Sequence, residues 1–248
     1  YSLLEPGKKK GNVVNLLGFF SPLVDDCEIY DLLHSAGVKT IHEISRCKDY
    51  KEYQTMSEAN FNLVLHHEAR FAAEDFHNRL QIPFIELRRL YQIDKIENQY
   101  HALGNALGVA FYDEKYKKQA EDALEKFRQK CPDASFAIGE CLNADPFELS
   151  LALIRYGFSV PEIYGTITVE NFTYIRSLEK ISPETKVFSN MEPTMIYYDP
   201  AKSDVNLAIG KDACYYHPDC PYVMWNGEEQ PYGYAGVRRL FEQLLEVV

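Results

Sequence analysis

The sequence predicts an α/β protein built from two successive Rossmann-like domains, each an open parallel sheet. Two observations predict this fold. Short apolar runs alternate with amphipathic stretches at helical spacing, and the alternation stops at a long charged stretch and then starts again. We expect one domain over residues 1–107 and a second over residues 108–248. No short-period repeat or low-complexity tract is present.

The first half contains four short runs that are expected to form strands. Residues 12–17 and 61–65 are apolar, residues 38–44 alternate between apolar and polar side chains, and residues 84–87 follow Pro83. Because amphipathic stretches separate these runs, the strands are expected to pair in parallel through helical crossovers.

Helices are expected between these strands and after them. The stretch that ends at Leu80 carries Phe71 and Phe76 on the apolar face that we predict for it. Two further helices, at 93–107 and 114–130, separate the two halves of the chain. The second of these is strongly charged, and its charges are typical of a solvated helix face rather than a nucleic-acid patch.

The alternation restarts in the second half. Strands are expected at residues 135–138, 160–164, 186–188, 205–209 and 222–225. Helices are expected at residues 146–156, 169–178 and 236–247. Since open parallel sheets bind ligands outside the carboxyl ends of their strands, the loops at those ends, 210–216 among them, are the expected location of a site.

The composition argues against several classes of protein. The chain has 26 Lys and Arg against 37 Asp and Glu, a net charge of −11, which argues against nucleic acid as a partner. No apolar run approaches the roughly 20 residues of a membrane helix. No apolar stretch of signal-peptide type follows residues 8–10, so we do not expect secretion. Six scattered cysteines without a C-x-x-C pair favour the reducing cytoplasm. Because the chain begins at Tyr1 rather than at a methionine, we expect it to be a fragment.

The common nucleotide-binding and hydrolase motifs are absent. The sequence contains neither G-x-G-x-x-G nor a Walker A lysine loop, which argues against a dinucleotide or P-loop site. It also contains neither a G-x-S-x-G elbow nor H-E-x-x-H, which argues against the hydrolases that carry them.

His66 and His67 stand where the apolar run 61–65 ends. A histidine at the carboxyl end of a strand can ligate a metal or move a proton near neutral pH, so both are candidate catalytic residues. The competing interpretation is a histidine at a helix start that bonds only to backbone or water.

Polar residues in several loops are candidates for cofactor binding. The Ser189 hydroxyl and its neighbouring backbone N–H groups can hold an anion. Cys141 would be reactive if a helix N-terminus lowered the pKa of its thiol, although Asp145 and Pro146 nearby are ordinary helix-start residues. Each of these loops can equally serve only packing. The candidate cofactor-binding residues are Ser21, Cys141, Ser189, Asn190, Trp225 and Asn226.

Cys214, His217 and Cys220 form the densest cluster of soft ligands in the sequence. Their three-residue spacing could supply three metal ligands, with Asp219 or water as a fourth. Zinc sites usually add a second ligand pair, which is absent here, and Pro218 interrupts any helix that would align the side chains. We therefore favour an ordinary loop and assign no metal ligand.

Five segments of the chain are distinctive when taken together, and they are residues 12–18, 61–66, 80–84, 199–210 and 230–236. Taken in order, they resemble the nitrogenase component 1 family. That family includes nitrogenase molybdenum–iron subunits, their cofactor-assembly scaffolds, and the dark-operative chlorophyll and nickel-tetrapyrrole reductases. The resemblance covers nearly the whole chain.

This resemblance implies an oxidoreductase subunit. Such a subunit would accept electrons from an ATP-dependent iron protein and reduce a small-molecule substrate at a metallocluster or tetrapyrrole in a crevice between the two domains. It would also pair with an identical or paralogous subunit. In the family an additional N-terminal domain carries the cysteines of an iron–sulfur cluster, so these ligands are expected outside this chain. The fragment alone is then expected to be inactive.

The cofactor ligands of nitrogenase itself do not carry over. In its catalytic subunit a cysteine ligand follows the strand that matches residues 61–65, and here His66 and His67 follow it. A histidine ligand follows its last strand, and here Trp225 and Asn226 stand there. A nitrogenase-like reductase is therefore favoured. The alternatives are a non-catalytic scaffold or binding module for a metallocofactor or small molecule, and an unrelated two-domain binder.

Overall fold

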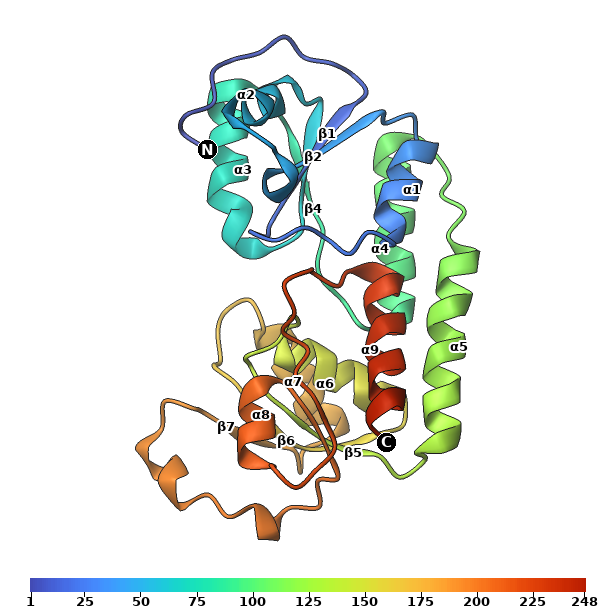
Figure 1. The fold of residues 1–248 in the computed structure, drawn as a ribbon, viewed down its shortest axis with the longest axis vertical. Helices are drawn as coiled ribbons and strands as arrows, with labels where there is room; N and C mark the ends of the chain where they lie inside the picture. The colour runs from blue at the N-terminus through green and yellow to red at the C-terminus, as the bar shows by residue number, and fades with distance from the viewer. The chain divides into compact units, whose positions relative to one another are not determined.

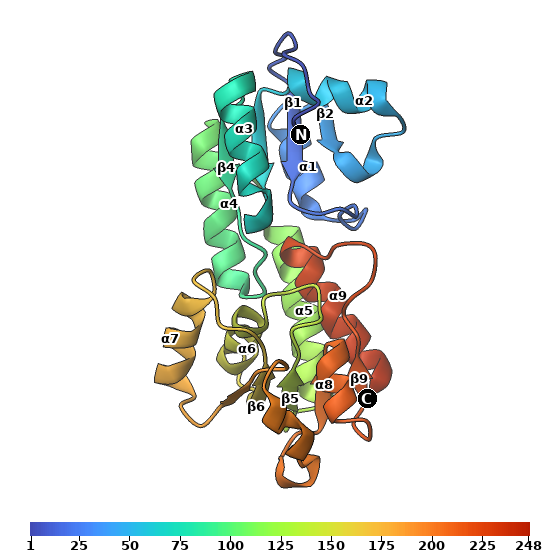
Figure 2. The same cartoon turned by 90° about the vertical axis from the view of Figure 1, so that its left-hand side faces the viewer.

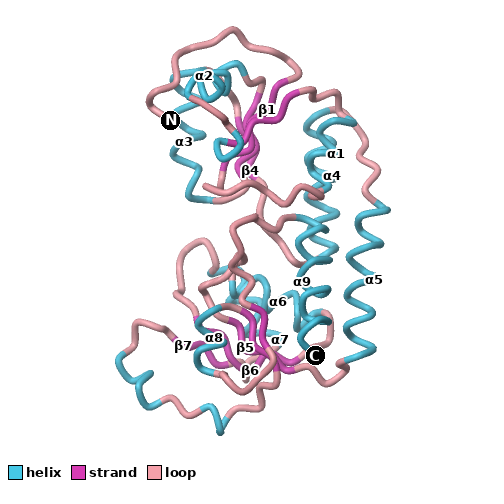
Figure 3. Tube along the Cα trace, in the orientation of Figure 1, coloured by secondary structure: helices cyan, strands magenta, loops and turns pink.

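The computed structural model describes residues 1–248, which form an α/β fold with two entirely parallel sheets (Figure 1). Figure 3 shows the strands as two separate groups, each surrounded by helices. This confirms the predicted pair of Rossmann-like parallel-sheet domains. No helix is both long and apolar enough to cross a membrane.

The chain passes several times between two structural units. Unit 1 contains Tyr1–Arg89, Ile96–Tyr116 and Glu228–Gly233. Unit 2 contains Leu90–Lys95, Lys117–Gly227 and Tyr234–Val248. The simpler division at residue 107, from sequence alone, stays a prediction.

The sheet of unit 1 has four strands in the order β2-β1-β3-β4. Its central strands β1 and β3 are buried at every residue, as expected for strands covered on both faces. Two asparagines on these strands, Asn15 and Asn62, are fully buried, and the Asn15 amide donates to the Asn62 side-chain oxygen at 2.7 Å. The strands are β1 Val13–Leu17, β2 Thr40–Glu43, β3 Phe61–Val64 and β4 Phe84–Glu86.

Helices cover both faces of this sheet. Helices α2 and α3 lie on one side, and α1 and α4 lie on the other (Figure 1). Phe76 and Leu80 of α3 belong to the core against Val13 and Leu17 of β1. The prediction for Phe71 is wrong, because its side chain is 77% exposed. The helices are α1 Glu28–Ser35, α2 Tyr50–Gln54, α3 Arg70–Leu80 and α4 Ile93–Leu107.

The sheet of unit 2 has five strands in the order β7-β6-β5-β8-β9. Each neighbouring pair of strands in this sheet is parallel. The chain therefore returns to the same end of the sheet through a crossover before each new strand. Helices α6 (Pro146–Arg155) and α7 (Phe172–Ile181) pack side by side, as Figure 2 shows. The strands are β5 Ser135–Ile138, β6 Ser159–Tyr164, β7 Lys186–Phe188, β8 Leu207–Ile209 and β9 Tyr222–Val223.

An aromatic cluster joins helices to this sheet. Phe127 of α5 contacts Phe136 of β5, Phe158 and Phe241 of α9, with ring centroids 5.5 to 6.0 Å apart. The segment 210–216, expected as a loop, contains a short helix instead. The helices of this half are α5 Glu114–Lys130, α6 Pro146–Arg155, α7 Phe172–Ile181, α8 Lys211–Tyr216 and α9 Gly233–Val247.

Candidate functional site

In unit 1 the loops after β1 and β3 touch each other at the carboxyl edge of the sheet. The Leu65 N–H donates to the Leu17 carbonyl at 2.7 Å. A Cβ on Gly18 would lie 2.8 Å from the backbone nitrogen of His66. Glycine is therefore required at residue 18 for this close approach, which fixes the backbone of His66.

The His66 ring sits between two other rings. Its centroid lies 5.6 Å from that of Phe19 and 4.4 Å from that of His67. His66 Nδ1 accepts the Glu68 backbone N–H at 3.4 Å and lies 3.8 Å from a Glu68 carboxylate oxygen. In a neutral ring the proton then resides on Nε2, and Nε2 is the atom that can donate to a ligand.

The electrostatic surroundings favour the neutral form of His66. Burial lowers the pKa of the His66 ring, and the charges of His67 and Arg89 lower it further against a smaller opposing effect of Glu68. The Arg89 guanidinium lies 4.1 Å from the Phe19 ring centroid and donates to the Gln230 side-chain oxygen at 2.7 Å. His66 is therefore a hydrogen-bond donor or a ligand at neutral pH.

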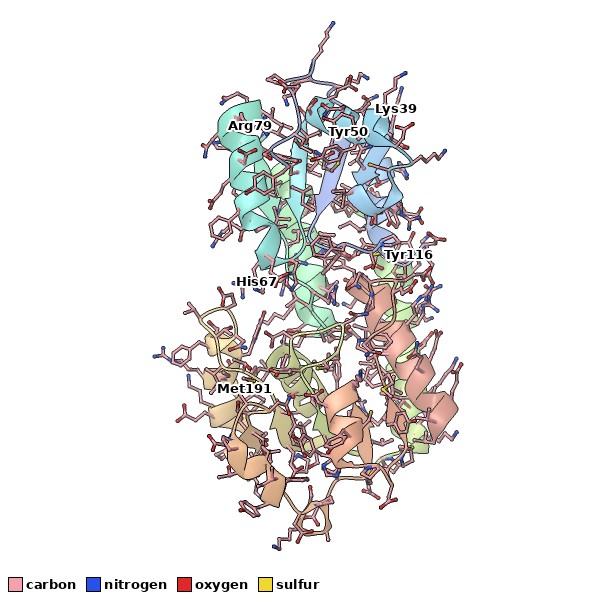
Figure 4. The ribbon with its side chains drawn as sticks, turned by 60° about the vertical axis from the view of Figure 1, so that its left-hand side comes forward. Lys39, Tyr50, His67, Arg79, Tyr116 and Met191 are labelled. Atoms are coloured by element: carbon pink, nitrogen blue, oxygen red, sulfur yellow. The ribbon has the colours of Figure 1, made fainter.

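His67 and Glu68 complete a group that has the donor atoms of a metal site. Their ligand atoms and that of His66 all lie within 4.8 Å of one another. Figure 4 shows His67 at the N-terminal end of α3, where the chain leaves β3. The imidazole and carboxylate donors of this group suit a first-row transition metal.

Cys214, His217 and Cys220 do not form such a group. His217 Nε2 lies 3.0 Å from a Glu162 carboxylate oxygen, and Cys220 Sγ donates to the Val205 carbonyl. Burial raises the pKa of the Cys214 thiol to about 11, so this sulfur is protonated at neutral pH. In the structure these side chains take part in packing and hydrogen bonding, and the interpretation as an ordinary loop without a metal stays a prediction.

In unit 2 a carboxylate joins the loops that follow β5, β7 and β8. Asp212 accepts the backbone N–H groups of Glu140 and Cys141 at 2.9 and 3.1 Å. It also accepts from the Asn190 side chain at 2.7 Å. The Glu140 carboxylate accepts the Thr166 N–H after β6 at 2.7 Å. These bonds bring two candidate residues, Cys141 and Asn190, to one place.

The Cys141 thiol is not activated by this arrangement. Burial raises its pKa, and the carboxylates of Asp212 and Glu140 raise it further. This is the opposite of the shift that a reactive cysteine at a helix N-terminus requires. Ser189 is half-buried, and its hydroxyl accepts the Met191 N–H at 3.3 Å.

Trp225 occupies a left-handed backbone conformation with φ of +46° and is 6% exposed. Its indole N–H donates to the Tyr91 hydroxyl at 2.7 Å, and the Tyr91 hydroxyl donates to the Asn143 carbonyl. The Asn143 N–H donates to the Trp225 carbonyl at 2.6 Å and closes the ring of contacts. Asn226 beside it is exposed, and Ser21 in unit 1 is half-buried.

The family model described as nitrogenase component 1 type oxidoreductase matches residues 2–248. The chain belongs to this family. Of the solved structures, a nitrogenase Cp1 at pH 6.5 has a TM-score of 0.72 at 19% identity over 99% of this chain. A nitrogenase Cp1 at pH 5 has a TM-score of 0.61 at 14% identity over 97% of this chain. No curated protein sequence matches.

The chain spans 61% and 57% of the lengths of these two nitrogenase chains. The family resemblance found in the sequence is thus confirmed, and at these identities the solved structures show the shared fold. The nitrogenase component 1 family typically binds iron–sulfur clusters. In this chain all six cysteines are unpaired thiols, and the group of potential metal ligands contains no cysteine. The donor set here does not fit a cysteine-ligated cluster.

The sequence pointed to His66, to the loop of Asn190 and to the segment 210–216. It singled out neither Asp212 within that segment nor Arg89, Phe19 and Gln230. Arg89 and Gln230 are 141 residues apart and meet only through the fold. One sequence feature could have predicted Asp212 as a site residue, because it stands shortly after the apolar run 205–209 and a glycine, where a strand is expected to end.

Proposed function

We propose that this chain is part of a nitrogenase component 1-like oxidoreductase subunit. That subunit accepts electrons from an ATP-dependent iron protein and reduces a small molecule held at a metallocluster or tetrapyrrole. It pairs with an identical or paralogous subunit and works in the cytoplasm. The observation that carries this proposal is the family match over residues 2–248.

The local geometry supports a role for the carboxyl edge of the sheet in unit 1. His66 is held by the Gly18 loop and by the Glu68 N–H, so its Nε2 position is defined before any ligand arrives. His67 is exposed next to it. We assign His66 and His67 to ligand contact and proton donation. We assign Ser21, in the loop after β1, to cofactor binding.

The bound cofactor supplies the electron-transfer chemistry. The protein residues contribute orientation and protons. His66 donates a hydrogen bond from Nε2 in its neutral form, and the exposed His67 beside it is the second proposed proton donor. In unit 2 we assign Cys141, Ser189, Asn190, Trp225 and Asn226 to cofactor binding.

The deciding experiment measures iron and acid-labile sulfide per chain after anaerobic purification. The longest gene product that contains this sequence is compared with the 248-residue chain. We expect stoichiometric iron and sulfide in the longer product and none in the 248-residue chain, because no cysteine group gathers in the latter. An iron-free longer product would overturn electron transfer through a cluster.

A non-catalytic scaffold or binding module for a metallocofactor or small molecule is the second candidate. The observation that favours it is the donor set, since His66, His67 and Glu68 can hold a metal ion without any cysteine. A longer product that lacks sulfide but binds a metallocofactor or tetrapyrrole would favour this function. A product that reduces substrate when the iron protein and ATP are added would exclude it.

A further inference from the structure

Four polar side chains that the proposed function leaves unused meet inside unit 2. They come from three parts of the chain, and we call them the Glu162 cluster. Glu162 and Tyr164 lie on β6, Tyr198 lies between β7 and β8, and His217 directly follows α8. Glu162, Tyr164 and His217 are at most 4% exposed, and Tyr198 is half-buried.

The local sequence places the cluster on one face of the sheet. Glu162 and Tyr164 are two residues apart on a strand, so their side chains point to the same side. The neighbouring strands contribute only small side chains to this face, Ala137 of β5 and Ala208 of β8. The space above these alanines is filled by α8 and by the segment 189–206, which brings Tyr198 over the sheet.

Four donor atoms of the cluster converge on one point. Glu162 Oε2 lies 3.0 Å from His217 Nε2, 2.9 Å from the Tyr164 hydroxyl and 2.6 Å from the Tyr198 hydroxyl. His217 Nε2 lies 3.1 and 3.0 Å from the same two hydroxyls. Atoms at such spacings lie roughly 2 Å from their common centre, which is the length of a bond from a transition metal to oxygen or nitrogen.

Hydrogen bonding alone does not account for this arrangement. Each hydroxyl has one proton and His217 Nε2 has at most one, so three protons serve five close contacts. At least two contacts therefore have no proton of their own. The buried Ser203 hydroxyl beside Glu162 and Tyr198 also lacks a hydrogen-bond partner of normal geometry. A cation at the common centre would attract the lone pairs of all four donor atoms at once.

We propose that the Glu162 cluster binds a single ferric ion, with Glu162, Tyr164, Tyr198 and His217 as its ligands. Carboxylate and phenolate oxygens are hard donors that suit Fe³⁺, and imidazole also binds iron. One carboxylate and two phenolates carry three negative charges, which a trivalent ion neutralises. The loaded site can therefore stay buried without a net charge.

Binding exchanges protons for the metal. The two phenolic protons pass to solvent, and the proton of the neutral His217 ring resides on Nδ1 so that Nε2 is free to bind. His217 thus acts with Glu162 and the two tyrosines, and not with Cys214 and Cys220. The ion joins β6, the segment 189–206 and the end of α8. This site is independent of the proposed oxidoreductase function.

The test uses the 248-residue chain, freed of metal by a chelator and titrated in air with ferric citrate. Iron that stays bound through gel filtration is measured together with the visible absorption spectrum. We expect one ferric ion per chain and the visible charge-transfer band that phenolate–iron(III) bonds produce. Because the ion fixes the segment 189–206, tryptic cleavage after the exposed Lys202 should slow by about tenfold.

Substitutions of tyrosine by phenylalanine identify the ligands. Tyr164→Phe and Tyr198→Phe keep the rings and are each expected to lower ferric affinity at least about a hundredfold, because losing even an outer partner of a ligand costs 10–100-fold. Tyr216→Phe is the matched control, since its ring stacks on Tyr164 at 4.6 Å but its hydroxyl is not one of the four donors. The double change His66→Ala and His67→Ala should also keep the band, because that group of potential ligands contains no phenol.

Any of three results would overturn the ferric site. In the first, the wild-type chain retains no ferric iron, whether or not it binds zinc or manganese. In the second, it retains iron without the charge-transfer band. In the third, Tyr164→Phe and Tyr198→Phe fold and bind ferric iron as tightly as the wild type. If these variants fail to fold, the wild-type titration decides, since the band requires a tyrosine ligand.

Discussion

His66 differs from a surface histidine in its fixed tautomer and lowered pKa. The Glu68 N–H occupies Nδ1, and burial together with the charges of His67 and Arg89 keeps the ring neutral near pH 7. Such a ring presents an N–H group of defined direction. Since His67 is exposed, the pair combines a positioned donor with a second imidazole that is open to solvent.

The first prediction concerns this pair. In the longest active gene product, the double change His66→Ala and His67→Ala is expected to lower turnover about a hundredfold, the range in which positioned proton donors act. The unfolding midpoint should change little, because neither side chain is part of the hydrophobic core. Steady-state turnover and urea denaturation measure the two effects. The exposed His101 supplies the control His101→Ala. Wild-type turnover in the double variant would remove His66 and His67 from the site.

A second prediction concerns Gly18. The change Gly18→Ala is expected to lower the free energy of unfolding by about 1–3 kcal/mol, because the new Cβ would lie 2.8 Å from the His66 nitrogen. Gly11→Ala is the matched control, since nothing lies within 4 Å of a Cβ there. Urea denaturation compares the two. Equal stability of both variants would mean that the loops after β1 and β3 do not meet closely.

Among the secondary-structure elements, α6 has the most complete start signal. Asp145 caps it by accepting the N–H groups of Phe147 and Glu148 on one carboxylate oxygen, and Pro146 occupies the first turn. These are the residues expected at a helix N-terminus, and the sequence placed this helix correctly. The burial of nearly the whole helix makes its start important for unit 2.

The third prediction tests this cap. Asp145→Ala is expected to lower the stability of unit 2 by about 1–2 kcal/mol, since two N–H groups lose their acceptor. Asp145→Asn keeps a side-chain oxygen and should recover most of that loss. Chemical denaturation followed by Trp225 fluorescence reports on unit 2, to which this tryptophan belongs. If both variants lose the same stability, the cap bond is not the cause.

Elements with strong local patterns were predictable. Strands β1 and β3 are buried throughout and apolar except for Asn15 and Asn62, and helices α4 and α5 match their predicted bounds. Helix α8 was missed because it has only six residues and no side-chain cap. Phe71 was misplaced because five residues of an α-helix rotate by roughly 500°, which puts Phe71 about 140° away from Phe76.

The candidate site was only partly predictable. His66 stands at the end of an apolar strand, so topology alone located it. Asp212, Glu140 and Asn190 meet only because β5, β7 and β8 end at the same edge of their sheet. Sequence periodicity carries no information about such contacts, since they join residues 22 to 72 positions apart.

At the scale of the whole molecule, unit 2 contains two buried glutamates with opposite effects on stability. The folded pKa of Glu148 lies above its ordinary value, so its contribution to stability falls as pH rises from about 4.5 to about 7. Burial also raises the pKa of Glu162, but hydrogen bonds from His217, Tyr198 and Tyr164 outweigh this and lower it to about 2. The stability that Glu162 contributes is present above pH 4.5 and lost as pH falls toward 2.

The last prediction follows from the Glu162 pair. Glu162 is 3% exposed and lies 3.0 Å from His217 Nε2, so its carboxylate interactions are poorly screened by water. Glu162→Gln is expected to lower the stability of unit 2 by about 3 kcal/mol at pH 6 and to have almost no effect near pH 2. Denaturation followed by Trp225 fluorescence at several pH values gives the difference between variant and wild type.

All other carboxylates are the same in the variant and the wild type, so their contributions to the pH dependence of stability cancel in this difference. Glu148→Gln provides the opposite comparison, since it should gain stability over wild type as pH rises from 5 to 8. Together the two glutamates place the optimum of their combined contribution near pH 4.5 to 5, between the two transitions. A Glu162→Gln deficit that stays constant from pH 6 to pH 2 would show that the lost contacts, and not the ionised carboxylate, account for its effect.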